Sequence, residues 1–282
     1  MIFIISFAAT KKLIIQTMAK ESSIWNKVMS AALKIPGVAV DREKFLRDSL
    51  KSYLCDSNIN DAVTKGTAGV VPSKILDKIA MQTIKSHTKK VTLLSAAMAV
   101  PGGWAALGTV PTDIAQFYYH VFVVAQKLAY TYGFPDMRDE NGRLSQSATT
   151  LLTIFVGVMT GVAVATKALQ ELGEVLKKQA IKKLPEYALS NGVLNAAVKK
   201  VSKMIGKELS RTGFAEGVSK LMPIISGVVA GALTYKSFKP QARRLSLNLR
   251  RTMLLLPQHS SASHPVVDVD YEELPPALPP KN

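Results

Sequence analysis

The sequence predicts an all-α protein: a multi-helix bundle with apolar helical hairpins, followed by a disordered C-terminal tail. Three observations lead to this prediction. Apolar residues recur at helical spacing through most of the 282 residues, cap residues and Pro or Gly breaks separate the periodic segments, and four prolines fall in the last eight positions. Nothing near the middle of the chain resembles a linker, so we expect one helical body.

Composition and charge limit the class of protein and the kind of partner that this helical domain can have. Hydrophobic residues make up 48% of the chain, which is high for a soluble domain and low for a protein made mostly of membrane spans. The formal net charge of +16 calls for an anionic partner, either lipid headgroups or nucleic acid. The apolar runs favour lipid. The single cysteine, Cys55, excludes an internal disulfide and indicates a reducing compartment.

Residues 1–20 are interpreted as an apolar leader or a mis-assigned start. Their lysines, Lys11 and Lys12, follow the first apolar residues, which is the reverse of the order in a secretory signal. Met18 is followed by an ordinary protein start, so the true start is either Met1 or Met18.

The helical body is predicted to begin with three capped segments. Ser23 can cap a helix that Pro36 and Gly37 end, and Asp41 can cap a second helix. The stretch 58–61 is expected to be a turn or a cap. Ser73 then caps a helix whose buried face carries isoleucines, namely Ile75, Ile79 and Ile84.

An uncharged run covers residues 91–112. A membrane-spanning helix needs about 20 apolar residues, and this run is long enough only if its break is ignored. The break consists of Pro101, Gly102 and Gly103, which remove a hydrogen-bond donor and favour a bend. We therefore expect two short apolar helices that meet in a hairpin.

The next helix is expected to be central, because it is apolar nearly all round. Thr112 or Asp113 can cap it, with Gln116 in capping-box spacing after Asp113, and Gly133 can end it. Asp113, Gln116 and His120 fall on one side of this helix, near Phe117. These four residues are a candidate groove for a proton or a headgroup; the alternative is a core histidine with satisfied hydrogen bonds.

Two further segments contain small residues at helix-packing spacing. The uncharged run 149–166 contains Gly157 and Gly161 and is either a buried core helix or a membrane segment. The run 223–235 repeats the spacing at Gly227 and Gly231. We expect the two segments to pack together.

Basic residues gather on the last two predicted helices. In residues 193–209 the lysines Lys199, Lys203 and Lys207 form a ridge opposite an apolar face, a pattern that suits a headgroup layer or a simple solvated face. The last helix adds four arginines, so the candidate contacts to an anionic surface include Arg243, Arg244, Arg250 and Arg251. After Pro257 the chain becomes acidic and Pro-rich, so residues 257–282 are predicted to be a disordered tail.

Several of these stretches together resemble the EcsC family of bacterial proteins. They are Ile35-Pro36-Gly37-Val38 with Asp41-Arg42, Leu76-Asp77-Lys78-Ile79-Ala80, Pro101-Gly102-Gly103, Pro111-x-Asp113-x-x-Gln116, the segment 125–133 and Phe238-Lys239-Pro240. The likeness covers residues 33–256, within a predicted helical domain at 21–256. The resemblance implies a membrane-associated bacterial protein, and it implies no particular reaction or set of catalytic residues. The chain also resembles helical domains of some bacterial membrane GTPases, but it lacks their phosphate-binding loop.

We therefore expect a non-catalytic protein at the cytoplasmic face of a bacterial inner membrane, peripheral or shallowly inserted. It would bind lipid or serve as an accessory to a membrane transport or secretion system. The alternatives are a membrane-inserting protein that forms pores or remodels the bilayer, and a hydrolase that acts on a lipid-like substrate near Asp113 and His120. No cofactor is expected, and the four histidines lack metal-site spacing. No motif for specific nucleic-acid recognition accompanies the charge.

Overall fold

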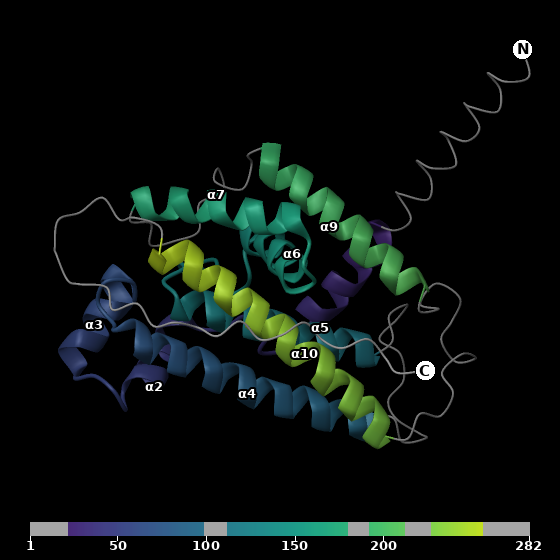
Figure 1. Cartoon of the computed structure of the whole chain (residues 1–282), viewed down its shortest axis with the longest axis horizontal. Coiled ribbons are helices and arrows are strands. Elements are labelled where there is room, and N and C mark those ends of the chain that lie inside the picture. Colours follow the sequence, from purple (N-terminus) through teal and green to yellow (C-terminus); the bar gives the residue numbers. More distant parts are fainter. Residues whose placement is uncertain (1–21, 99–111, 180–191, 212–226, 256–282) are drawn as a thin grey trace, which may run out of the picture.

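The computed structural model describes residues 22–98, 112–179, 192–211 and 227–255, which pack as a bundle of α-helices (Figure 1). In these ranges the one β-type pairing is an isolated bridge between Arg138 and Leu144. The predicted all-α class is confirmed. The leader at 1–20, the bend at Pro101–Gly103 and the tail at 257–282 lie outside the described residues.

The described residues form the following helices, in chain order. A first helix covers residues 22–33. The others are α2 (Arg42–Leu50), α3 (Asp56–Lys65), α4 (Ser73–Met98), α5 (Thr112–Thr131), α6 (Gln146–Met159), α7 (Ala163–Gln179), α9 (Gly192–Arg211) and α10 (Gly227–Arg250), with a π-helical turn, η3 (Arg251–Leu255), after α10.

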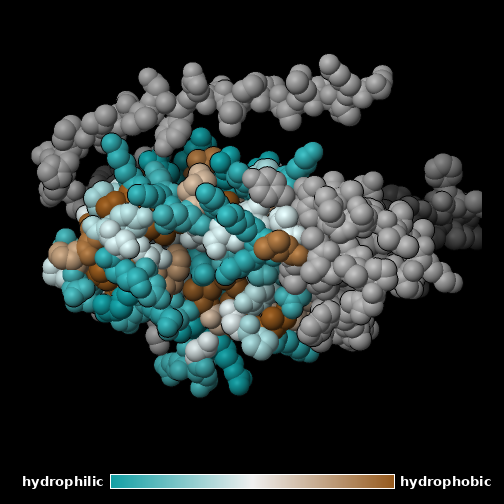
Figure 2. All heavy atoms as spheres, turned by 90° about the horizontal axis from the view of Figure 1, so that it is seen from below, coloured by the Kyte–Doolittle hydropathy of each residue, from teal (hydrophilic) through white to brown (hydrophobic). Residues whose placement is uncertain are grey.

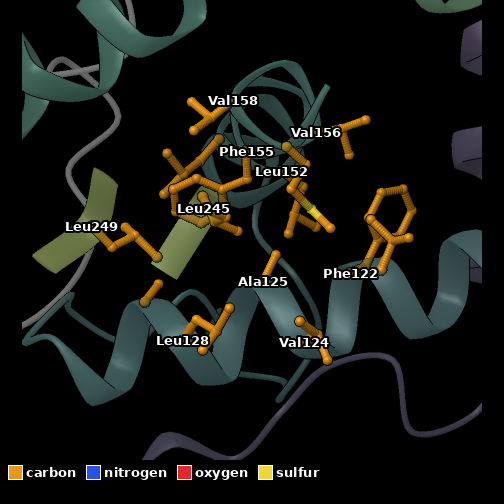
Figure 3. Close-up of a cluster of buried hydrophobic side chains, with 14 of the residues drawn as sticks. Phe122, Val124, Ala125, Leu128, Leu152, Phe155, Val156, Val158, Leu245 and Leu249 are labelled. Carbon is orange, nitrogen blue, oxygen red and sulfur yellow. The ribbon is translucent and has the colours of Figure 1, made fainter. Parts of the chain in front are cut away.

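The core forms where α5, α6 and α10 meet. Figure 3 shows Phe122, Ala125 and Leu128 of α5 facing Leu152 and Phe155 of α6, and Leu245 and Leu249 of α10 close the same cluster. All seven side chains are fully buried. The α5 helix is therefore central, as its apolar composition predicts. It ends at Thr131, and Gly133 follows in the turn with a φ of 98° that a residue with a Cβ would rarely adopt.

The α4 helix differs from the prediction. It runs without interruption from Ser73 to Met98 and so includes the start of the apolar run at Val91. No glycine or proline occurs in this stretch, so nothing ends the helix where the charge disappears. The first arm of the expected hairpin is thus the end of a 26-residue helix that packs along α10.

The uncharged segment 149–166 is not one helix. The α6 helix ends at Met159, Gly161 takes a φ of 83°, and α7 begins at Ala163. Every residue from Leu151 to Met159 is buried against the neighbouring helices, so this part of the segment belongs to the protein core. Among the described residues, no helix is long and apolar enough to cross a membrane.

One of the three caps predicted for the first helices is confirmed. Asp41 caps α2 as predicted, because its carboxylate accepts the backbone N–H of Lys44 at 2.9 Å. Ser23 instead lies inside the first helix, and Ser73 is the first residue of α4, where backbone N–H groups of the first turn donate to the carbonyl of Pro72. The stretch 58–61 lies inside α3 and not in a turn. Ile59 and Ala62 are buried there, and Asp56 lies in the first turn, where it interacts favourably with the helix dipole.

Candidate functional site

The described members of the predicted groove lie on α5 and contact two different helices. Phe117 packs edge-on against Phe238 of α10, with ring centroids 6.1 Å apart. His120 packs against His87 of α4, with centroids 5.8 Å apart. Gln116 is half-buried, and the side chain of Asp113 lies outside the described residues. The polar side of α5 therefore meets α4 at a pair of histidines.

Next to this histidine pair a surface pocket of about 350 Å³ opens between α2, α4 and α5. Its polar lining includes Ser49 and Ser52 near the end of α2, Thr83, Ser86 and His87 of α4, and Lys127 of α5. The pocket exists because α4 and α5 pack side by side with His87 and Lys127 at the same level.

His87 is 5% exposed, and its Nε2 lies 3.3 Å from Nζ of Lys127. Burial lowers the pKa of His87 to about 3, helped by the positive charges of Lys127, His120 and Lys90, so the imidazole is neutral at pH 7. When the ammonium of Lys127 donates to Nε2, the ring proton must sit on Nδ1. Nδ1 is buried and has no hydrogen-bond partner.

Lys127 is half-buried and has no carboxylate within ion-pair distance in the described part of the chain. Its ammonium lies over the ring of Phe45, 5.7 Å from the centroid. Burial lowers the pKa of Lys127, and the charge of Lys90 lowers it further. The same two causes, in the same order, lower the pKa of His120 to about 4. The region thus holds excess positive charge.

This pocket is absent from the sequence-based prediction. His87 and Lys127 are 40 positions apart on separate helices, and no short motif contains both of them. One observation could have pointed to Lys127: it lies in the segment 125–133, which is among the stretches that resemble the EcsC family. In the described ranges, no group of three or more His, Cys, Asp or Glu residues could hold a metal ion.

The predicted lysine ridge lies on α9, at the outer edge of the bundle (Figure 1). One face of α9 is buried through four residues, namely Leu194, Ala197, Val201 and Ile205. On the other side Lys199 and Lys207 are exposed and Lys203 is half-buried. Met204 lies among them with 47% of its surface exposed.

Three of the four predicted surface arginines have partners inside the described part of the chain. Arg250 donates through Nε to both carboxylate oxygens of Asp77, at 2.9 and 3.0 Å, and Arg244 donates to the carbonyl of Met159 at 2.9 Å. Arg243 donates to the sulfur of Met81 on α4 at 4.0 Å. Arg243, Arg244 and Arg251 are exposed and Arg250 is half-buried, so contact with a neighbouring helix does not remove these arginines from the surface.

The glycines at helix-packing spacing have different surroundings. A Cβ on Gly157 would come within 2.5 Å of Val201 on α9 and 2.7 Å of Ala165 on α7. Gly161 has a positive φ at the end of α6. Gly227 and Gly231 lie in the first turns of α10, where side-chain surroundings are not described.

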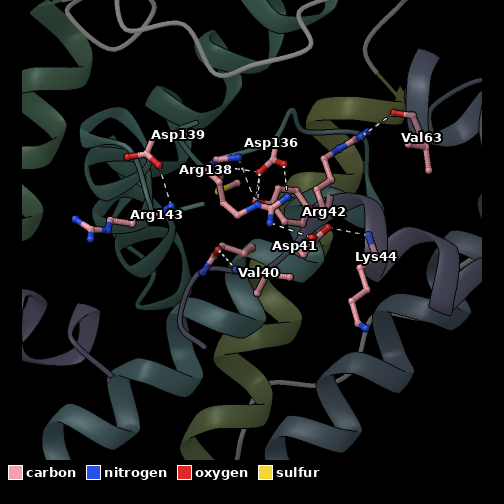
Figure 4. A network of polar contacts seen from close by, with 12 residues as sticks. Val40, Asp41, Arg42, Lys44, Val63, Asp136, Arg138, Asp139 and Arg143 are labelled. Atoms are coloured by element: carbon pink, nitrogen blue, oxygen red, sulfur yellow. Dashed lines mark hydrogen bonds and ion pairs between the residues drawn. The ribbon is translucent and has the colours of Figure 1, made fainter. Parts of the chain in front are cut away.

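A second polar cluster, shown in Figure 4, joins the start of α2 to the turn after α5. Arg138 pairs with Asp41 and Asp136, each at 3.0 Å. Arg42 donates to the carbonyls of Phe134 and Val63 at 3.0 and 2.8 Å. These groups satisfy one another, so we assign this cluster a structural role.

Known proteins offer no guide to the chemistry of these sites. No protein-family model matches the chain, and neither the curated proteins nor the solved structures that were compared with it give a match.

Proposed function

We propose that this chain is a peripheral membrane protein of the EcsC type, at the cytoplasmic face of a bacterial inner membrane. It binds anionic lipid without catalysing a reaction, or serves as an accessory to a membrane transport or secretion system. The observation that supports this proposal is the outer face of α9, where Lys199 and Lys207 are exposed and Met204 is exposed beside the lysine row. Lysines attract anionic headgroups, and an apolar side chain between them can enter the headgroup layer.

The rest of the described surface favours the edge of a membrane over its interior. Figure 2 shows the face over α4, where hydrophobic residues form separate spots in a mostly hydrophilic surface. Among the described residues, the exposed large apolar side chains are Met81 and Leu93, twelve positions apart on α4, Met204 on α9 and Leu247 on α10. Scattered apolar residues of this kind are normal on a protein that is surrounded by water.

The membrane-inserting alternative has one observation in its favour. Leu93, near the end of α4, is 70% exposed and lies eight positions before Pro101 in the sequence. A protein that inserts this region would release dye from loaded vesicles, whereas a surface-bound protein would leave them intact. The hydrolase alternative requires an activity that Asp113→Asn or His120→Ala removes from a protein that still folds.

Co-sedimentation with vesicles tests the main proposal. We expect the full chain to bind phosphatidylcholine vesicles that contain phosphatidylglycerol, and to bind pure phosphatidylcholine weakly. Substitution of Lys199, Lys203 and Lys207 by Gln should weaken binding by about 100-fold, since each lysine near an anionic surface contributes about 1 kcal/mol. High salt should release the protein, because salt screens such contacts.

The matched control removes the same charge from another face. Lys74, Lys85 and Lys89 are exposed on α4, and their substitution by Gln changes the net charge by the same amount. Equal loss of binding in both triple variants would show that only total charge matters, which would contradict a role for α9. If the α9 variant kept full binding, that result would also contradict a role for α9 in membrane attachment.

A further inference from the structure

We propose that the pocket between α2, α4 and α5 is a binding site for a single phosphate group, with Lys127 as its cationic anchor. This inference goes beyond membrane attachment, because the pocket and the lysines of α9 lie on different elements. The phosphate belongs either to a free phosphomonoester or to the headgroup of a lipid.

The charge of the pocket is the first reason. Lys127 meets a neutral imidazole and an aromatic face instead of a carboxylate. Lys90 adds positive charge close by, and this charge lowers the pKa of Lys127, His87 and His120 alike. An anion in the pocket would offset this repulsion, so the charges favour an anionic ligand.

The acidic groups near the pocket do not neutralise this charge. The one carboxylate in its lining is Asp48, which is at the rim and pairs with Lys51 at 3.3 Å. Lys78, on α4, lies over the ring of Tyr53, another lining residue, at 5.1 Å. Of the two charged residues in the lining, Asp48 is paired with Lys51, whereas Lys127 has no carboxylate partner among the described residues.

The hydroxyl groups of the lining are the second reason. Ser49, Ser52, Thr83, Ser86 and Tyr53 approach the pocket from α2, the turn after it and α4. Each hydroxyl can donate one hydrogen bond, in a direction that its rotor selects. A tetrahedral anion accepts such single bonds from several sides.

The absence of arginine from this lining argues for phosphate over carboxylate. A planar carboxylate is usually recognised by the two parallel N–H groups of a guanidinium, whereas lysine binds phosphate as a point charge. A volume of about 350 Å³ is near the lower end of the usual range for ligand sites. The pocket therefore suits a phosphomonoester with a small organic part.

Titration calorimetry of the full chain with inorganic phosphate and with glycerol phosphate tests the free ligands. Vesicles of phosphatidylcholine with phosphatidic acid, matched in surface charge to vesicles with phosphatidylglycerol, test the lipid. Phosphatidic acid presents a phosphomonoester and phosphatidylglycerol a diester. Saturable binding of the free anions would identify a soluble ligand, and a preference for phosphatidic acid vesicles alone would identify a lipid.

Either binding mode should require Lys127. We expect Lys127→Met to weaken it by about tenfold or more, the cost of losing one charged hydrogen bond, and to leave attachment to phosphatidylglycerol vesicles unchanged. Lys85→Met, an exposed lysine of α4 outside the pocket lining, is the control and should bind as the wild type does. The α9 triple variant should keep its affinity for free phosphate, so each proposal can fail without the other.

A measurement on the wild type avoids any folding defect of the Lys127 variant. Phosphate should raise the pKa of His87, because an anion beside the ring stabilises its charged form, and ¹⁵N NMR of the imidazole would follow this change. If neither free phosphate nor phosphatidic acid binds in a way that depends on Lys127, and the His87 resonances do not move, the proposal is wrong.

Discussion

At the scale of single residues, Gln126 joins the connection before α2 to the central helix. Its amide nitrogen donates to the carbonyl of Val38 at 2.7 Å, and its amide oxygen accepts the backbone N–H of Val40 at 3.0 Å. The side chain is fully buried. The Gln126 amide thus satisfies the hydrogen bonds of two backbone groups that would otherwise be buried without partners.

Gln126→Leu keeps the volume of the side chain and removes both bonds. The N–H of Val40 would then be buried without a partner, which costs about 1–3 kcal/mol. We expect the free energy of unfolding, measured in urea, to fall by this amount. Gln146→Leu, at an exposed position on α6, should change it by less than about 0.5 kcal/mol. Similar values for both variants would mean that the bonds of Gln126 contribute nothing.

At the scale of helices, Gly157 sets how closely α6 approaches α7 and α9. Alanine is favoured over glycine inside a helix by about 1 kcal/mol, so propensity alone predicts that Gly157→Ala stabilises the protein. A Cβ there would be 2.5 Å from Val201, which is too close. We therefore expect a net loss of about 1–3 kcal/mol, the usual cost of overpacking, in a denaturant titration.

The double variant Gly157→Ala/Val201→Ala tests whether this contact is the cause. Removal of the Val201 methyl groups leaves room for the new methyl group, so the two changes together should cost less than the sum of the single changes. Simple additivity would place the cause elsewhere, for example at Ala165, which would be 2.7 Å from the same Cβ.

Local signals predicted most of the helices, because caps and apolar spacing act over a few residues. Asp41 and Gly133 lie at helix ends, as expected. The segment 149–166 was harder to interpret, because a hydropathy run does not reveal that Gly161 takes a positive φ and divides it. The α4 helix continues past Val91 because loss of charge alone does not end a helix.

The candidate sites were harder to predict from the sequence than the helices were. The face of α9 follows from spacing within one helix, so its lysine ridge could be read from the sequence. The pairing of Arg250 with Asp77 joins residues 173 positions apart, and the contact of His87 with Lys127 depends on how α4 and α5 pack. Tertiary packing decides such contacts, and one sequence carries little information about it.

At the scale of the whole molecule, the buried His87 and the half-buried His120 make stability depend on pH. Their pKa values, about 3 for His87 and about 4 for His120, lie below the ordinary value of 6.5, so the folded protein binds fewer protons than the unfolded chain. Stability is therefore full above about pH 6.5 and falls as the pH drops, by at most about 1.4 kcal/mol per pH unit for each histidine.

Denaturant titrations between pH 7 and pH 4, in buffers free of phosphate, would measure this slope. His87→Phe should flatten it, because the variant has no proton to gain at this position, and His120→Phe should flatten it less. An unchanged slope in both variants would show that other groups cause the acid sensitivity, with the carboxylate of Asp41, whose pKa is lowered chiefly by its bond to Lys44, as the next group to test.

The packing of α10 along α4 has a consequence for synthesis of the chain on the ribosome. Asp77 is made early and meets Arg250 only after 173 further residues, which takes about 9–35 s at ordinary rates of translation. During that time the apolar side of α4 that α10 will cover faces water. A nascent chain of this kind is a natural client for chaperones that hold exposed helices, and a stop codon before α10 would leave that surface open permanently.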